Sequence, residues 1–98
     1  MTDSTHIECT AKTLKALAHP LRLKVLCTLH DREMSVKEIV ASSGATQSNI
    51  SQHLNHLREE GILASRRDAN RVYYSIAKVE LIDLIKMMQS IYCSNEAA

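Results

Sequence analysis

Two short helices, expected one directly after the other within residues 35–61, restrict the fold of this 98-residue chain more than any other feature. Ser35 and Glu38 have the S-x-x-E spacing of a capping box, which predicts that a helix begins at Val36. Gly44 follows this helix, over residues 36–42, as a C-terminal stop, because glycine readily adopts the left-handed conformation found there. The first of the two helices is therefore only about two turns long.

The second of these helices is expected to begin after Thr46, a favourable N-cap residue, and to run to about residue 60, before Gly61. A tight turn of sequence SGA joins it to the preceding helix. Its apolar residues recur at the helical spacing i, i+4, i+7: Ile50, Leu54 and Leu57. Two short helices joined in this way, over residues 35–60, have the layout of a helix-turn-helix.

Further elements are expected on both sides of this pair. Apolar residues at spacings of three and four predict a helix over residues 7–18, and Pro20 suits the first position of another helix that continues to about Asp31. After Gly61, β-branched and aromatic residues on both sides of a polar RDAN tip predict a hairpin over 62–76. A last helix is expected over 79–93.

This order of elements predicts a mainly α fold, a winged helix-turn-helix of five helices with a two-stranded wing. The chain is short and lacks a Pro/Gly/Ser-rich linker, so residues 1–98 are expected to form one domain. The apolar sector of the last helix is too wide for one modest contact. We therefore expect a homodimer that forms through the terminal helices, 7–18 and 79–93.

The helix after Thr46 has a candidate DNA-reading face. Gln and Asn can bond an adenine edge, and Ser can bond bases or phosphates, which suits a helix in the major groove of double-stranded DNA. An ordinary solvated face would have a similar composition, and His53 also fits a structural role better than a metal site. The candidate DNA contacts on this helix are Gln47, Ser48, Asn49, Ser51, Gln52, His53 and Asn55.

The predicted wing adds three cations, Arg66, Arg67 and Arg71, which could reach phosphates or the minor groove. The formal net charge of the chain is only +1, so its overall charge does not indicate nucleic-acid binding. Binding would depend on local geometry and on the two copies of a dimer that meet half-sites one helical turn apart.

Several other classes of protein are not indicated. The sequence has no Gly-rich phosphate loop and no nucleophile elbow, so an enzyme is not expected, and neither a cofactor nor a metal site is predicted. No apolar stretch approaches the roughly 20 residues that span a membrane, and the N-terminal residues do not form an export signal. The expected location is the cytoplasm.

Three cysteines, Cys9, Cys27 and Cys93, form no CxxC motif, which argues against both a disulfide framework and a zinc knuckle. Cys27 lies within an apolar run, so one interpretation is a buried and inert thiol. Cys93 lies near the C-terminus, where exposure and oxidation are easier.

Three stretches, LKALAHPLRLKVLCTL, SQHLNHLREEGIL and the wing RRDANRVYYSI, resemble the ArsR family of winged-helix repressors along essentially the whole chain. The resemblance implies a homodimer that binds an operator and releases it when an inducer is present. Two metal-sensing patterns of that family are missing. One subgroup has a thiolate cluster where this chain reads MSVKEIV, and the other has His ligands in the last helix, whereas here no His follows His56.

Cys27 in VLCTL and Cys93 in IYCS resemble the dithiol of the sulfide- and persulfide-responsive branch of the family. The resemblance implies that reactive sulfur species join these two thiols, release the operator and derepress sulfide-detoxification genes, with Cys9 as an accessory thiol. Two alternatives stay open. One is a repressor that senses a trivalent metalloid, arsenic or antimony, through the three thiols. The other is a redox-inert winged-helix regulator.

Overall fold

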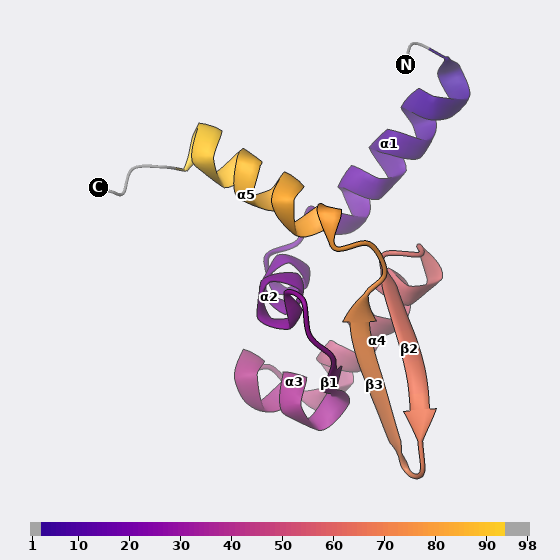
Figure 1. The fold of residues 1–98 in the computed structure, drawn as a ribbon, viewed down its shortest axis with the longest axis vertical. Coiled ribbons are helices and arrows are strands. Elements are labelled where there is room, and N and C mark those ends of the chain that lie inside the picture. The colour runs from indigo at the N-terminus through magenta and orange to yellow at the C-terminus, as the bar shows by residue number, and fades with distance from the viewer. Residues whose placement is uncertain (1–2, 94–98) are drawn as a thin grey trace.

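Five helices and three short strands form a winged helix in the computed structural model, which describes residues 3–93 (Figure 1). The predicted fold class and its five helices are confirmed. α1 and α5 extend from one end of the molecule and the hairpin of β2 and β3 from the other (Figure 1). The elements are α1 (Ser4–Leu17), α2 (Pro20–Leu29), β1 (Met34–Ser35), α3 (Val36–Ser43), α4 (Gln47–Glu59), β2 (Leu63–Asp68), β3 (Arg71–Ile76) and α5 (Glu80–Tyr92).

The helix-turn-helix of α3 and α4 begins with the predicted capping box. The Ser35 hydroxyl accepts a 3.2 Å hydrogen bond from the backbone N–H of Glu38, and the Glu38 carboxylate accepts one of 2.8 Å from the N–H of Ser35. Gly44 ends α3 at φ +76°, in the left-handed region, and the Thr46 hydroxyl caps α4 by accepting from the N–H of Asn49. Local capping therefore fixes both ends of the turn between the two helices.

The sheet contains a strand that the sequence patterns did not predict. β1 pairs with β3 in antiparallel register, Met34 opposite Tyr74 and Ser35 opposite Tyr73, so the strand order is β1-β3-β2. The expected wing of two strands is thus part of a three-stranded sheet. β1 has only two residues, too few to show an alternating pattern.

α1 begins three residues earlier than expected. The carboxylate of Asp3 accepts a 2.7 Å hydrogen bond from the N–H of Thr5, and this N-cap allows the helix to start at Ser4 rather than Ile7. The other predicted helix boundaries lie within one or two residues of the observed ones.

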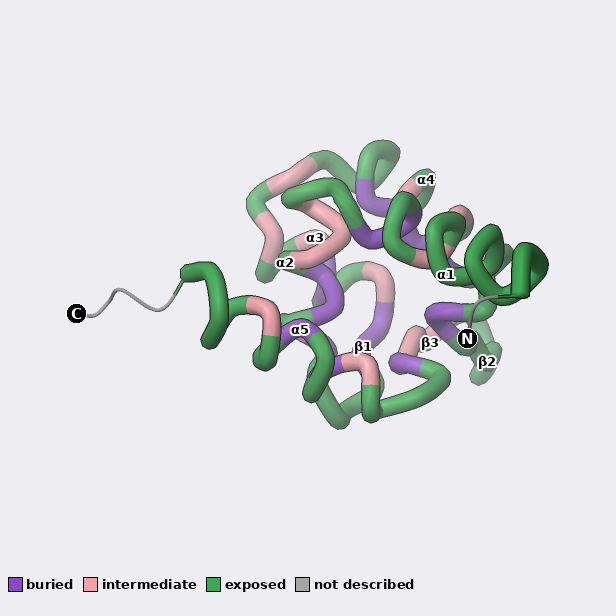
Figure 2. Tube along the Cα trace, turned by 90° about the horizontal axis from the view of Figure 1, so that it is seen from above, coloured by how far each residue is buried: buried purple, intermediate pink, exposed green. Residues whose placement is uncertain are grey.

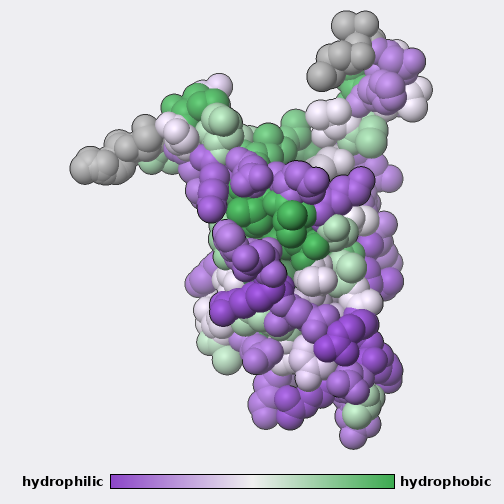
Figure 3. All heavy atoms as spheres, viewed as in Figure 1, coloured by the Kyte–Doolittle hydropathy of each residue, from purple (hydrophilic) through white to green (hydrophobic). Residues whose placement is uncertain are grey.

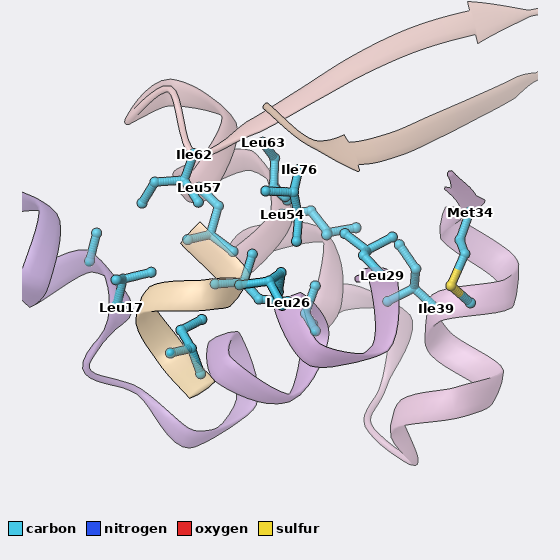
Figure 4. Packing of buried hydrophobic residues seen from close by; sticks show 14 of the residues in the cluster. Leu17, Leu26, Leu29, Met34, Ile39, Leu54, Leu57, Ile62, Leu63 and Ile76 are labelled. Carbon is cyan, nitrogen blue, oxygen red and sulfur yellow. The ribbon is translucent and has the colours of Figure 1, made fainter. Parts of the chain in front are cut away.

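The core lies where α2, α4 and α5 meet the base of the hairpin (Figure 4). Leu26 of α2 packs among leucine and isoleucine side chains from these elements (Figure 4). The predicted stripe of α4 is fully buried, since Ile50, Leu54 and Leu57 are each 0% exposed. Burial of this stripe turns the opposite, polar face of α4 outward.

Most residues of α1 and α5, the two helices that extend from the body, are exposed (Figure 2), and several of them are large and apolar. In the space-filling view, apolar residues gather along α5 and below it, whereas hydrophilic residues cover the hairpin (Figure 3). Within the described residues, no helix is long and apolar enough to cross a membrane. The exposed large apolar residues are Ile7 and Leu14 of α1, Val79 before α5, and Leu84, Met87, Ile91 and Tyr92 of α5.

Candidate functional site

The outward face of α4 carries most of the residues that we predicted to contact DNA. Six of the seven are exposed: Gln47, Ser48, Asn49, Ser51, Gln52 and Asn55. In the described part of the chain, the side chains of Gln47, Ser48, Ser51 and Gln52 form no hydrogen bond with another residue. The donors and acceptors in the first turns of α4 are therefore available to a ligand.

Asn55 differs from these residues because its amide has partners on α4. Its Oδ1 accepts a 2.6 Å hydrogen bond from Arg58, and its Nδ2 lies 3.4 Å from the carboxylate of Glu59. Contact between Asn55 and a base edge would require these bonds to break. The polar side chains in the N-terminal half of α4 are thus more available for contact with a base edge than Asn55 in the C-terminal half.

His53 lies on the inner side of α4, away from the outward face on which it was grouped. Its Nδ1 accepts a 2.9 Å hydrogen bond from Nε of Arg22, and its ring centroid is 4.3 Å from that of His19. The pKa of His53 is lowered by burial first, and then by the charges of His19, Arg22 and His56. The structure thus gives His53 a structural role between α2 and α4.

The three arginines of the wing are not equivalent. The guanidinium of Arg66 donates two 2.7 Å hydrogen bonds to the carboxylate of Glu33 and lies over the ring of Tyr73, 4.7 Å from its centroid. Arg66 therefore has partners within the protein, and its contact with phosphate stays a prediction. Arg67 and Arg71 are exposed beside the tip of the hairpin, where they face Val72 and Asp68 in the register.

A groove of about 460 Å³ joins α3, α4 and the tip of the hairpin. Two of its residues, Lys37 and Asn70, were not among the predicted DNA contacts. Lys37 follows the first residue of α3, and the sequence signal that it carried was a positive charge next to a helix N-terminus. The groove is lined by Ser35, Val36, Lys37, Gln47, Ser51, Asn70, Arg71 and Val72.

Cys27 is exposed on α2, so the interpretation that it is buried is wrong. The helical period explains this, since Val25, Leu26 and Leu29 turn into the core and Cys27 falls between them on the outer side. The thiol lines a hollow of about 380 Å³ between α2 and α5, together with His30, Ile82, Ile85, Lys86 and Gln89. Lys86 therefore borders the same hollow as Cys27.

Cys93 follows the last residue of α5 and is exposed. Its backbone N–H donates a 2.8 Å hydrogen bond to the carbonyl of Gln89, a residue that lines the hollow at Cys27. Cys93 thus lies one helical turn beyond that hollow. Cys9 is exposed on α1, a different helix.

The three thiols do not gather into a metal site within one protomer. Among residues 3–93, no group of three or more His, Cys, Asp or Glu side chains is arranged to hold a metal ion. Trivalent metalloids bound by thiolates would need such a group of sulfur ligands.

Comparison with known proteins gives a consistent family. The family model described as "Bacterial regulatory protein, arsR family" matches residues 19–65. The biofilm growth-associated repressor of Xylella fastidiosa is 37% identical over 86 residues, which are 88% of this chain and 75% of that protein.

Two solved structures of similar proteins agree with this family assignment. HlyU from Vibrio cholerae is 34% identical, with a TM-score of 0.82, over 94% of this chain and all of that one. The winged helix-turn-helix DNA-binding domain Mb0332 from Mycobacterium bovis, described as homodimeric, is 26% identical, with a TM-score of 0.83, over 97% of this chain and 91% of that one.

Proposed function

This chain belongs to the arsR family of bacterial regulatory proteins, and from that premise we propose that it is a homodimeric transcriptional repressor controlled by reactive sulfur species. In this proposal the dimer binds an operator and releases it when Cys27 and Cys93 of a protomer become linked. The observation that carries the DNA-binding part is the polar outer face of α4 beside the exposed cations of the wing. The observation that carries the sensing part is the exposure of Cys27 next to Lys86.

DNA recognition is assigned to the first turns of α4. Gln47 and Gln52 offer the amide groups that bond an adenine edge in the major groove, and Ser48 and Ser51 suit bases or phosphates. Arg67 and Arg71 would contact the DNA backbone on the side of the wing. Phosphate contacts of this kind set the register of the protein, while the amides of α4 read the sequence.

Dimerisation is assigned to the exposed apolar residues of α1 and α5. The exposed Leu84, Met87 and Ile91 form one side of α5, while its Ile82 and Ile85 are buried in the protomer. Contiguous apolar surface of this kind is typical of a protein interface. The homodimeric relative from Mycobacterium bovis supports a second copy of this chain as the partner.

The sensing chemistry needs a persulfide such as glutathione persulfide. Each protein thiolate attacks the outer sulfur of one glutathione persulfide and displaces glutathione thiolate, which leaves a cysteine persulfide. One cysteine persulfide then attacks the carbon-bound sulfur of the other and displaces hydrosulfide, which leaves a trisulfide between Cys27 and Cys93. The extra sulfur lengthens the bridge beyond a disulfide, which requires Cα atoms within about 7 Å.

Lys86 favours this reaction through its charge. It lines the hollow beside the Cys27 thiol, and glutathione persulfide is anionic. A nearby cation attracts an anionic reactant to the thiol.

Variants of the three cysteines test this function. The probe is a fluorescent duplex that the reduced wild-type protein selects from a random-sequence library. Glutathione persulfide is expected to release this duplex from wild type and from Cys9→Ser, the matched control, but from neither Cys27→Ser nor Cys93→Ser. If glutathione persulfide released the duplex from Cys27→Ser to the same extent as from wild type, the proposed sensor would be contradicted. If the protein selected no duplex from the library, DNA binding itself would be contradicted. Release by arsenite in place of persulfide would indicate a metalloid sensor instead.

A further inference from the structure

One partly buried arginine joins three helices of this fold. Nε of Arg22, on α2, donates a 2.9 Å hydrogen bond to Nδ1 of His53 on α4. Nη1 of the same guanidinium donates one of 2.9 Å to the carbonyl of Ala16 in the last turn of α1. Both bonds are partly buried. Arg22 therefore ties the end of α1 to the middle of α4.

The bond to Ala16 satisfies an acceptor that its own helix leaves free. The last four carbonyl groups of an α-helix have no intrahelical donor, and a buried carbonyl without a partner is costly. Ala16 is only 4% exposed. The guanidinium is thus held in place at one side while its Nε remains directed at His53.

The bond to His53 requires a neutral imidazole. Because Nδ1 accepts the hydrogen bond, the ring proton must be on Nε2. The neighbouring His19 also accepts at Nδ1, in its case a 3.2 Å hydrogen bond from the backbone N–H of Leu21. Protonation at Nδ1 of His53 would remove the acceptor and place a second cation against the guanidinium of Arg22.

The groups that line the hollow beside Arg22 offer little to compensate such a charge. A hollow of about 430 Å³ between α1, α2 and α4 is lined by Lys12, Lys15, Ala16, Arg22, His56 and Glu60. Among these residues Glu60 alone carries a carboxylate, and that carboxylate lies 3.9 Å from Nζ of Lys12. The lowered pKa of His53 agrees with this geometry.

We propose that Arg22 is a positioning residue for α4, acting through neutral His53, and that protonation of His53 loosens α4 and weakens operator binding. This inference rests on the proposed function of α4 in DNA binding. The stabilisation from neutral His53 is complete above the ordinary imidazole pKa of 6.5 and is lost as the pH falls from there through the lowered pKa of the folded protein.

The direction in which acid changes DNA affinity distinguishes a positioning role of His53 from the effect of its added positive charge. An additional positive charge on α4 would by itself tighten binding to DNA in acid. Loss of the Arg22 bond would weaken it, by about fivefold for one hydrogen bond. His53→Asn is the informative variant, because Oδ1 of asparagine accepts at the position of Nδ1 but does not titrate. His56→Asn is the matched control, a histidine of the same helix that is not bonded to Arg22.

The experiment measures the Kd for the selected duplex, at constant ionic strength, from pH 7.5 to 5.5. Between these limits the Kd of wild type and of His56→Asn is expected to rise about fivefold relative to that of His53→Asn. At pH 7.5, His53→Asn should bind within about twofold of wild type. Arg22→Lys, which cannot donate to both partners, should bind about fivefold more weakly at pH 7.5 and lose the acid response. Equal pH profiles for wild type and His53→Asn would overturn the proposal.

A measurement without DNA keeps the inference separate from the proposed function. Long-range ¹⁵N–¹H NMR spectra of the reduced wild-type protein should show His53 protonated at Nε2 at pH 7.5, with a titration midpoint below 6.5. A His53 ring protonated at Nδ1 would overturn the positioning link even where DNA binds. If the protein selected no duplex although His53 was protonated at Nε2, the proposed function would fail while the hydrogen bond between Arg22 and His53 existed. That result would also overturn the link between this bond and DNA binding.

Discussion

The carboxylate of Glu33 accepts two 2.7 Å hydrogen bonds from Arg66, a residue 33 positions away on β2. Arg66 also lies over the ring of Tyr73 on the adjacent strand β3. This pair fastens the hairpin to the segment just before β1. We therefore expect Arg66 to contribute less to DNA phosphate contacts than the other two wing arginines.

Replacement of Arg71 by alanine should reduce the salt dependence of operator binding. Each phosphate contact contributes about 0.9 to the slope of log K against log salt, so a dimer that loses two contacts should lose about 2 from the slope. Anisotropy titrations of the selected duplex over a range of KCl concentrations measure this slope. Arg66→Ala is the control and should leave the slope nearly unchanged. An equal loss of slope for both variants would show that Arg66 is available to phosphate after all.

The capping residues of the helix-turn-helix should be measurable in stability. Ser35→Ala removes the acceptor for the N–H of Glu38, and Thr46→Ala removes the acceptor for the N–H of Asn49. Each change should lower the free energy of unfolding by about 1 kcal/mol, as measured by urea denaturation. Ser42→Ala, at an exposed position of α3, should lower it by much less. Equal stability of Ser35→Ala and wild type would show that the capping box does not stabilise α3.

Acid should weaken the capping box of α3. The backbone N–H and then the hydroxyl of Ser35 lower the pKa of Glu38 from its ordinary value of 4.5. A lowered pKa in the folded state means that the stabilisation is complete above 4.5 and is lost as the pH falls through the lower value. Glu38→Gln should therefore flatten the acid limb of a plot of Tm against pH. Glu59→Gln, outside the capping box, is the control, and an acid limb unchanged by Glu38→Gln would contradict the assignment.

A charge on the outer side of α5 should separate the subunits. Ile91 is 60% exposed and Met87 is 59% exposed in a protomer, and both are apolar. Ile91→Asp or Met87→Asp would bury a carboxylate in the proposed interface, which is strongly unfavourable without a partner. Sedimentation velocity should show a dimer for wild type and for Ala41→Asp, an exposed position on α3, but a monomer for the α5 variants. A wild-type monomer at micromolar concentration would refute the assigned interface.

The helices could be predicted because their signals are local. The capping box of Ser35 and Glu38, the stop at Gly44 and the N-cap at Thr46 each act within four residues, and each appears in the structure as expected. β1 could not be predicted, because its two residues form a strand only through pairing with β3.

Contacts between distant residues limited the prediction of the site. The partners of Arg66 and His53 are 33 and 31 positions away, so no local pattern could show that these two side chains have partners within the protein. The exposure of Cys27 was readable in principle. The positions of Val25, Leu26 and Leu29 on α2 leave it on the outer side of the helix.

The central claim is tested most directly by the peptides that hold the reactive thiols. After treatment of reduced wild-type protein with glutathione persulfide, trypsin should release residues 25–32 joined to residues 87–98. Mass spectrometry should find this pair with one additional sulfur atom and two fewer hydrogen atoms than the two thiols, formed in parallel with loss of DNA binding. The peptide that carries Cys9, residues 1–12, should remain outside the link. Loss of DNA binding with residues 25–32 and 87–98 unlinked would contradict the account.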